Sequence, residues 1–322
     1  MQSAPLLTTR RELLLGLAGA ALASAKVRNS MYNPEIAAHT SIWLFEAELR
    51  KRRAADILEE ALSSTHAAGY SRVELAADFL AGNLKNRTIK LLERNKLAPS
   101  IVFVEGPLYT REDAEKSRAK VKDLAWAVMG RGARYINFSL AVKPNAQPMS
   151  AAELDLEAYQ LNRMGDDIAA AGLDLMVHHH EAEMRDDARE WRYLLAHTEP
   201  KLVSFCLDVD TASRAAMNPV SLIDAAGFRL RALHLRNPKN GQDQELFRDG
   251  DIDMYQIARQ LRQMQYDGLL VVELIHRADT KRHYSLPTDL SLSRWYAQEV
   301  FGARPGSLPV DMGPHVRLHP HS

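Results

Sequence analysis

The chain has 322 residues, and its 41 basic and 41 acidic side chains give a formal net charge of zero. This balance excludes the broad positive field that is typical of proteins binding nucleic acids or anionic membranes. The single cysteine, Cys206, excludes an internal disulfide framework, and its apolar surroundings predict a buried strand residue. A hydrophobic content of 46% and a charged content of 25% are ordinary for a globular protein of one or two domains.

The first 25 residues have the pattern of an export signal. Arg10 and Arg11 precede an apolar run of Leu, Gly and Ala, which ends in the cleavage-type sequence Ala23-Ser24-Ala25. A basic pair, a modest hydrophobic region and small residues before the cut resemble a twin-arginine signal. The run is too short and too rich in Ala and Gly for a membrane span. The sequence therefore predicts a mature protein that begins near Lys26 and works in a bacterial periplasm without stable membrane insertion.

From residue 40 onward, short apolar runs alternate with segments of helical periodicity. The first four expected strands are 42–45, 72–76, 101–104 and 134–138, and the helices after them are 46–68, 84–97, 111–130 and 151–171. Strands five to eight are expected at 174–180, 203–208, 231–234 and 269–273, with helices at 184–197, 219–226, 252–266 and 288–301.

Eight strand–helix repeats over about 260 residues indicate a single-domain (β/α)8 TIM barrel within residues 26–302. An open doubly wound sheet is the competing architecture, but no G-x-G-x-x-G follows the first strand. The tail, residues 303–322, is rich in Pro, Gly and His and is expected to be an irregular extension.

Four consecutive strands end in charged or metal-binding side chains. Asp208, His234 and Glu273 follow strands six, seven and eight, and strand five ends in a run of three histidines. The carboxyl ends of barrel strands converge on one mouth, so we expect these side chains to meet there. Two carboxylates with one or two imidazoles suit Mn²⁺, Mg²⁺, Co²⁺ or Zn²⁺, with His178 or His180 completing the set. Ordinary polar groups of a barrel mouth are the alternative interpretation.

Alternation along strand five sends His178 and His180 to one side and His179 to the other, where we expect a packed or solvated residue. Other side chains near the mouth are candidates for binding a substrate. Arg236 lies on the same side of its strand as His234 and is suited to a hydroxyl, carboxylate or phosphate. The remaining candidates are His180 at the end of strand five, Lys239 and Glu245 on the loop after strand seven, and Trp43 as a sugar-stacking wall, for which core packing is an equal alternative. Glu74 and Asn137 are weaker candidates.

Five segments of the chain resemble the sugar phosphate isomerase/epimerase family, part of the xylose-isomerase-like TIM barrel superfamily. They are 177–184 (VHHHEAEM), 206–210 (CLDVD), 233–237 (LHLRN), 249–253 (DGDID) and 272–273 (VE). The resemblance covers about residues 36–302. It implies one divalent metal held by Glu, Asp, His and Glu at the ends of strands five to eight. Asp208, His234 and Glu273 match three of these positions, whereas His178 stands where the epimerases have the first Glu.

The resemblance implies a metal-dependent isomerase or epimerase acting on a sugar or polyol. Glu273 and His178 would abstract and return a proton next to a carbonyl, through an enediolate that the metal stabilises. A lyase or dehydratase acting on keto-sugars or 3-keto-glycosides would share the early chemistry. A non-catalytic carbohydrate-binding barrel is a third hypothesis. A metal-dependent nuclease is disfavoured by the balanced charge, so no nucleic-acid partner is expected. A periplasmic location argues against a phosphorylated substrate, and the oligomeric state cannot be inferred.

Overall fold

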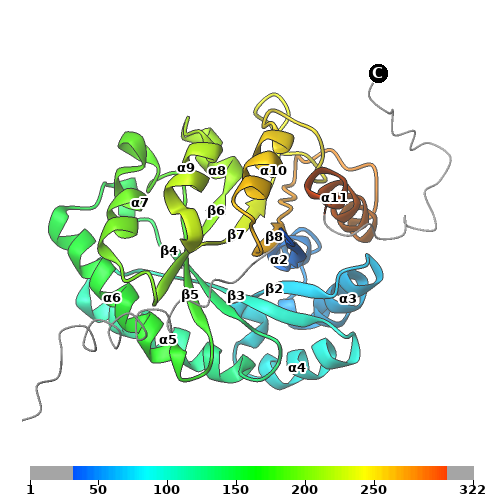
Figure 1. Cartoon of the computed structure of the whole chain (residues 1–322). Coiled ribbons are helices and arrows are strands. Elements are labelled where there is room, and N and C mark those ends of the chain that lie inside the picture. Colours follow the sequence, from blue (N-terminus) through cyan, green and yellow to red (C-terminus); the bar gives the residue numbers. More distant parts are fainter. Residues whose placement is uncertain (1–31, 303–322) are drawn as a thin grey trace, which may run out of the picture. The chain divides into compact units, whose positions relative to one another are not determined.

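The computed structural model describes residues 32–302, which form a closed barrel of eight parallel strands in sequence order (Figure 1). This confirms the predicted TIM barrel. The strands are β1 (Glu35–His39), β2 (Arg72–Ala76), β3 (Ala98–Gly106), β4 (Tyr135–Leu140), β5 (Asp174–His178), β6 (Val203–Asp208), β7 (Leu230–Leu235) and β8 (Leu269–Val272). The predicted export signal and C-terminal tail lie outside the described residues.

Helices surround the barrel and cover the outer face of its strands (Figure 1). They are α2 (Ser41–Leu49), α3 (Ala54–Ala67), α4 (Leu84–Arg94), α5 (Arg111–Val128), α6 (Ala151–Ala169), α7 (Arg185–His197), α8 (Val209–Arg214), α9 (Pro219–Ala226), α10 (Met254–Gln263) and α11 (Leu286–Phe301). Within the described part of the chain, no helix combines the length and the apolar character needed to cross a bilayer.

The strands are buried on both faces, which explains why their apolar runs lack a clean alternation. Their outward side chains pack against the helices in one large core. The barrel interior holds a separate, smaller cluster of Ala37, Ile101, Met176, Cys206, Ala232, Leu269 and Val271. Cys206 is fully buried as expected, and burial raises the pKa of its thiol to about 11. Several small side chains fill the interior, and the larger polar groups lie above them toward the mouth.

The prediction of strand one at 42–45 was wrong. This segment lies in α2, whose buried residues include Ile42, Trp43, Glu46 and Ala47, a spacing that gives one face of a helix. Strand β1 instead occupies the short, Ala-rich Glu35–His39, which has weak strand propensity and is held by pairing with β2 and β8. The predicted helix 46–68 is correspondingly divided into α2 and α3.

Trp43 is therefore not a wall of the mouth. Its side chain is fully buried, and its indole N–H donates a hydrogen bond to Oγ1 of Thr65 on α3 at 3.0 Å. The residue packs α2 against α3, which corrects its assignment as a sugar-stacking residue.

Candidate metal centre and active site

The imidazole of His234, on β7, lies at the centre of the candidate site. Its Nε2 lies 2.6 Å from Oε2 of Glu74 on β2, and its Nδ1 lies 3.2 Å from Oε2 of Glu273, which follows β8. Glu74 and His234 are fully buried, and the side chain of Glu273 is 15% exposed. Asn137 on β4 donates a hydrogen bond of 2.8 Å to Oε1 of Glu74. These contacts form a carboxylate–imidazole–carboxylate row that runs from the barrel interior to the mouth.

Asp208, at the end of β6, is fixed by backbone donors. Its Oδ1 accepts hydrogen bonds from the N–H groups of Asp210 and Thr211, both at 3.0 Å, and thereby caps α8. The backbone N–H of Asp208 donates to Nε2 of His179 at 3.1 Å. Only Oδ2 of Asp208 is then directed to other side chains of the mouth.

The guanidinium of Arg236 joins the carboxylates on this side of the mouth. It forms a short hydrogen bond to Oδ2 of Asp208, and its Nε lies 3.3 Å from Oε2 of Glu273. It also contacts Oδ2 of Asp210 at 3.3 Å and donates to Oγ1 of Thr211 at 2.9 Å. Arg236 is thus held in a cage of three carboxylates beside His234.

The three histidines after β5 follow the predicted alternation. His178 and His180 both lie near Ser139 on β4, with ring nitrogens 3.3 Å from its Oγ, whereas His179 points to the backbone of Asp208. Nε2 of His178 is buried, lacks a hydrogen-bond partner among the described residues, and lies 4.0 Å from Oδ2 of Asp208. His180 is half-buried and contacts carboxylates of Glu105 and Glu183 at 3.7 and 3.9 Å.

Two groups of described residues offer ligand atoms that lie within 4.8 Å of one another. One consists of His178, Asp208 and His234, and the other of His39, Glu74 and His234. The first group contains three of the four predicted ligands. Glu273 belongs to neither group and lies beside His234. The predicted four-residue set is therefore brought together, but only three members have the spacing of a common coordination sphere.

The tautomer of His39 distinguishes the two groups. Nδ1 of His39 accepts a hydrogen bond from the N–H of Ser41 at 3.1 Å. Burial lowers the pKa of His39, so its ring is neutral and carries its proton on Nε2, the atom that faces Glu74 at 3.8 Å. A nitrogen that carries a proton has no lone pair for a metal, so His39 would have to exchange tautomers, and His234, whose pKa is raised, would have to lose a proton when a metal binds. The first group fits a metal better, because the buried Nε2 of His178 has no other partner.

Electrostatics separate the two imidazoles. Burial and the neighbouring histidines lower the pKa of His178 well below its usual value, so this ring is neutral and able to act as a ligand or base. Burial alone would also lower the pKa of His234, but Cys206, Glu74 and Glu273 raise it well above its usual value. Burial opposes ionisation of Asp208 and Glu273, yet Arg236 and His234 outweigh it and keep the pKa of each carboxyl below its usual value.

Two predicted substrate contacts lie on the loop after β7. Lys239 is exposed there. The side chain of Glu245 is only 3% exposed, and its oxygens accept hydrogen bonds from the N–H groups of His283 and Tyr284 and contact Nδ1 of His283 at 2.6 Å. Glu245 therefore ties this loop to the loop after β8, which leaves it little capacity to contact a substrate.

Sequence reasoning missed His39 and underestimated Glu74. His39 was hidden because β1 was placed seven residues too late, at an apolar run. In strands five to eight an apolar run ends in a charged or imidazole side chain, and Glu74 does not follow this pattern. Its place at the site becomes visible from the barrel register, which pairs it with His39.

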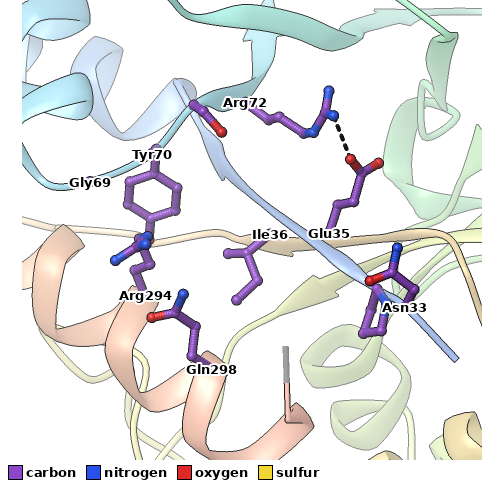
Figure 2. A pocket seen from close by; sticks show the side chains of 10 residues that line it. Asn33, Glu35, Ile36, Gly69, Tyr70, Arg72, Arg294 and Gln298 are labelled. Carbon is purple, nitrogen blue, oxygen red and sulfur yellow. Dashed lines mark ion pairs between the residues drawn. The ribbon is translucent and has the colours of Figure 1, made fainter. Parts of the chain in front are cut away.

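A different hollow, of about 440 Å³, lies at the amino end of the barrel (Figure 2). It is lined by Asn33, Pro34, Glu35, Ile36, Gly69, Tyr70, Ser71, Arg72, Arg294 and Gln298, none of which was predicted to act in the site. Arg294 lies against Gly69, where an added Cβ would be 3.0 Å from its Nη1. Another hollow, on the loops after β7 and β8, is lined by the predicted residues Lys239 and Glu245.

Comparison with known proteins places this geometry in a family. Residues 62–294 match the family model described as xylose isomerase-like TIM barrel. An inosose dehydratase of Mesomycoplasma hyopneumoniae is 25% identical over 244 residues, which cover 67% of this chain and 80% of that protein.

Two solved structures share the fold. D-psicose 3-epimerase from Clostridium cellulolyticum H10, solved with D-tagatose, has a TM-score of 0.66 at 15% identity and covers 83% of this chain and 99% of its own. A xylose isomerase-like barrel protein from Mycobacterium smegmatis, solved in complex with magnesium, has a TM-score of 0.62 at 16% identity, covering 79% and 91%. With a family model matched over most of its length, the chain belongs to the xylose isomerase-like TIM barrel family.

Proposed function

We propose that the protein is a divalent-metal-dependent isomerase or epimerase of a sugar or polyol, acting by proton abstraction next to a carbonyl. The observation that carries the proposal is the convergence of His178, Asp208 and His234 within 4.8 Å at the barrel mouth, beside the ionised Glu273. Two imidazoles and a carboxylate suit Zn²⁺, Mn²⁺ or Co²⁺ better than they suit a metal that prefers thiolate ligands.

The side chains of the mouth have separate tasks in this proposal. Glu273 accepts the proton from the carbon next to the carbonyl, because its carboxylate is ionised and lies at the edge of the buried cluster. Arg236 fixes the orientation of Glu273 through its Nε contact and offers a cation to substrate oxygens. A divalent cation, when bound, would polarise the substrate carbonyl and favour the enediolate. His178 serves as the third ligand, beside Asp208 and His234, or as the second acid/base group.

Dehydration of a keto-sugar or polyol is a second candidate, favoured by one specific observation. The residue at the end of β5 is a neutral imidazole, so the mouth lacks the symmetric pair of carboxylates that epimerisation on two faces would use. Elimination needs one group that removes a proton and a proton donor or Lewis acid that assists the leaving hydroxyl, so it does not require a second carboxylate. The similarity to an inosose dehydratase supports this candidate.

The test is proton exchange in D₂O. The protein loaded with Zn²⁺, Mn²⁺ or Co²⁺ is incubated with ketohexoses, inososes and 3-keto-glycosides, and the sugars are followed by NMR. Epimerisation predicts deuterium at the carbon next to the carbonyl together with an epimer, and dehydration predicts loss of water. Stoichiometric sugar binding with no exchange under any metal would overturn both enzyme proposals in favour of a carbohydrate-binding barrel.

We also propose export by the twin-arginine route, on the sequence of residues 1–25. Replacement of Arg10 and Arg11 by Lys should retain the precursor in the cytoplasm, as measured by fractionation of an expressing bacterium. Normal export of the double variant would contradict the proposal.

A further inference from the structure

The loops after β7 and β8 enclose a hollow of about 670 Å³, which we term the loop cleft. Its basic lining residues come from three places: Arg214 from α8, Lys239 and Arg248 from the first loop, and Arg277 and Lys281 from the second. Five cations therefore face three carboxylates, those of Asp243, Glu245 and Asp279. Because the whole chain has a formal net charge of zero, the excess of cations over carboxylates in the loop cleft is local to this place.

Two of the three carboxylates are already committed to other partners. Asp243 lies 2.6 Å from Nη2 of Arg214 and 3.2 Å from Nε of Arg277, so it bridges both guanidiniums. Glu245 is buried beneath the loop after β8, where its oxygens accept from His283 and Tyr284. Among the lining residues only Asp279 is left to balance the other cations, and outside the lining Asp251 interacts electrostatically with Lys239.

Three cations of the loop cleft lack an ion pair within the described part of the chain. Lys239, Arg248 and Lys281 are all exposed and have no carboxylate within 4.0 Å, and Arg248 donates one hydrogen bond to Gln244 at 2.7 Å. Exposed cations keep most of their hydration, so they are open to an anionic ligand.

The loop cleft adjoins the candidate metal centre. Asp243 and Gln244 line both the loop cleft and a small hollow whose other walls include Arg236 and Glu273. Asp210 also lies between the two places, because it forms ion pairs with Arg236 at the candidate metal centre and with Arg214 in the loop cleft. The two hollows therefore share wall residues, which places the loop cleft beside the hollow at Glu273. Loops after strands seven and eight are also a recurrent place for anion binding in TIM barrels.

Resting on the proposed function, we propose that the substrate carries a carboxylate that binds in the loop cleft while the reacting carbons lie at Glu273. This assigns the substrate class as a sugar acid rather than a neutral sugar, and the proposed export argues against a phosphate. The reacting end and the anionic end are recognised by different residues, so the two can be tested separately.

The experiment measures binding of D-glucuronate, D-glucose 6-phosphate and neutral D-glucose to the metal-loaded protein by calorimetry. D-Glucuronate should bind tenfold or more tightly than glucose, with an affinity that falls as NaCl is raised. Tighter binding of D-glucose 6-phosphate than of D-glucuronate would overturn the carboxylate assignment. The variant Lys239→Gln/Lys281→Gln should reduce binding of D-glucuronate to the level of glucose.

The matched control is Lys90→Gln/Lys201→Gln, which removes two exposed lysines outside the loop cleft. Equal affinity for all three probes, no binding of either anion, or the same loss in the control would overturn the proposal. Metal content and exchange in D₂O are measured on the same samples. If both persist while the anion preference is absent, only the loop cleft proposal fails, and the proposed function stands.

Discussion

The two ends of the barrel hold glutamates in opposite environments. At the amino end, Glu35 on β1 is 26% exposed and pairs with Arg72 (Figure 2). Glu35 also pairs with Arg134, whose Nη2 lies 2.5 Å from its Oε2. On β2, Glu74 is fully buried and faces His234 at 2.6 Å. A half-exposed ion pair contributes little to stability, whereas a buried charge is costly unless its partners are in place. This demanding arrangement of Glu74 and His234 lies at the mouth, as expected for a functional site.

Replacing each of these two glutamates by glutamine should change the free energy of unfolding by very different amounts. Glu74→Gln leaves the buried His234 without its compensating charge and should lower the free energy of unfolding by about 3–5 kcal/mol. Glu35→Gln should lower it by less than about 1 kcal/mol. Urea unfolding of both variants measures the difference. Similar losses would mean that the two ends do not differ in the way described.

Activity should depend on the mouth alone. Glu273→Gln keeps an oxygen in place but removes the charge and the basicity, so turnover should fall by ~10² or more. Glu35→Gln should leave turnover unchanged and serves as the control. Steady-state kinetics on the substrate identified by exchange gives both numbers, and unchanged turnover in Glu273→Gln would remove its assignment as the base.

A buried acid in the loop cleft region should give the protein a pH-dependent stability. Burial and the adjacent Glu245 raise the pKa of Asp289 to about 8. Between about pH 4 and 8 the folded state then holds a proton that the unfolded chain has released, so this group loses its stabilising contribution as pH rises through that window.

Asp289→Asn should remove this contribution. As the pH rises from 5 to 8, the unfolding free energy of the variant should increase relative to that of the wild type. Taking this difference cancels the effects of titrating groups that the two proteins share. A pH-independent difference for Asp289→Asn would contradict the raised pKa.

The smallest effect is expected in the helical layer. Trp43→Phe removes the hydrogen bond to Thr65 and should cost about 1 kcal/mol of stability, with substrate affinity unchanged. Loss of substrate affinity without loss of stability would restore the sugar-stacking interpretation.

Much of the fold was predictable from the sequence, because buried parallel strands are visible as apolar runs separated by helical periodicity. Strands five to eight are good examples, since each run ends at a charged or imidazole side chain. The failure at β1 has a physical reason: Glu35–His39 is stabilised by its neighbours β2 and β8, and not by its own composition. The more apolar segment beside it is one face of a helix.

The candidate site was predictable where residues lie at strand ends in one register, as for Asp208 and His234. The side-chain contacts within the site could not be predicted from the sequence. No pattern in the sequence indicates that Arg236 bridges Asp208 and Glu273, or that Glu245 is used to hold a loop, because both depend on how loops fold over the mouth.

The central claim is that His178, Asp208 and His234 bind a divalent metal at the mouth. Elemental analysis of the purified protein, after loading with Zn²⁺, Mn²⁺ or Co²⁺ and removal of free metal, tests it directly. The account predicts one ion per chain in the wild type and in Glu35→Gln, and a large loss in Asp208→Asn and His178→Gln. A wild type that retains no metal, or variants that retain as much as the wild type, would contradict it.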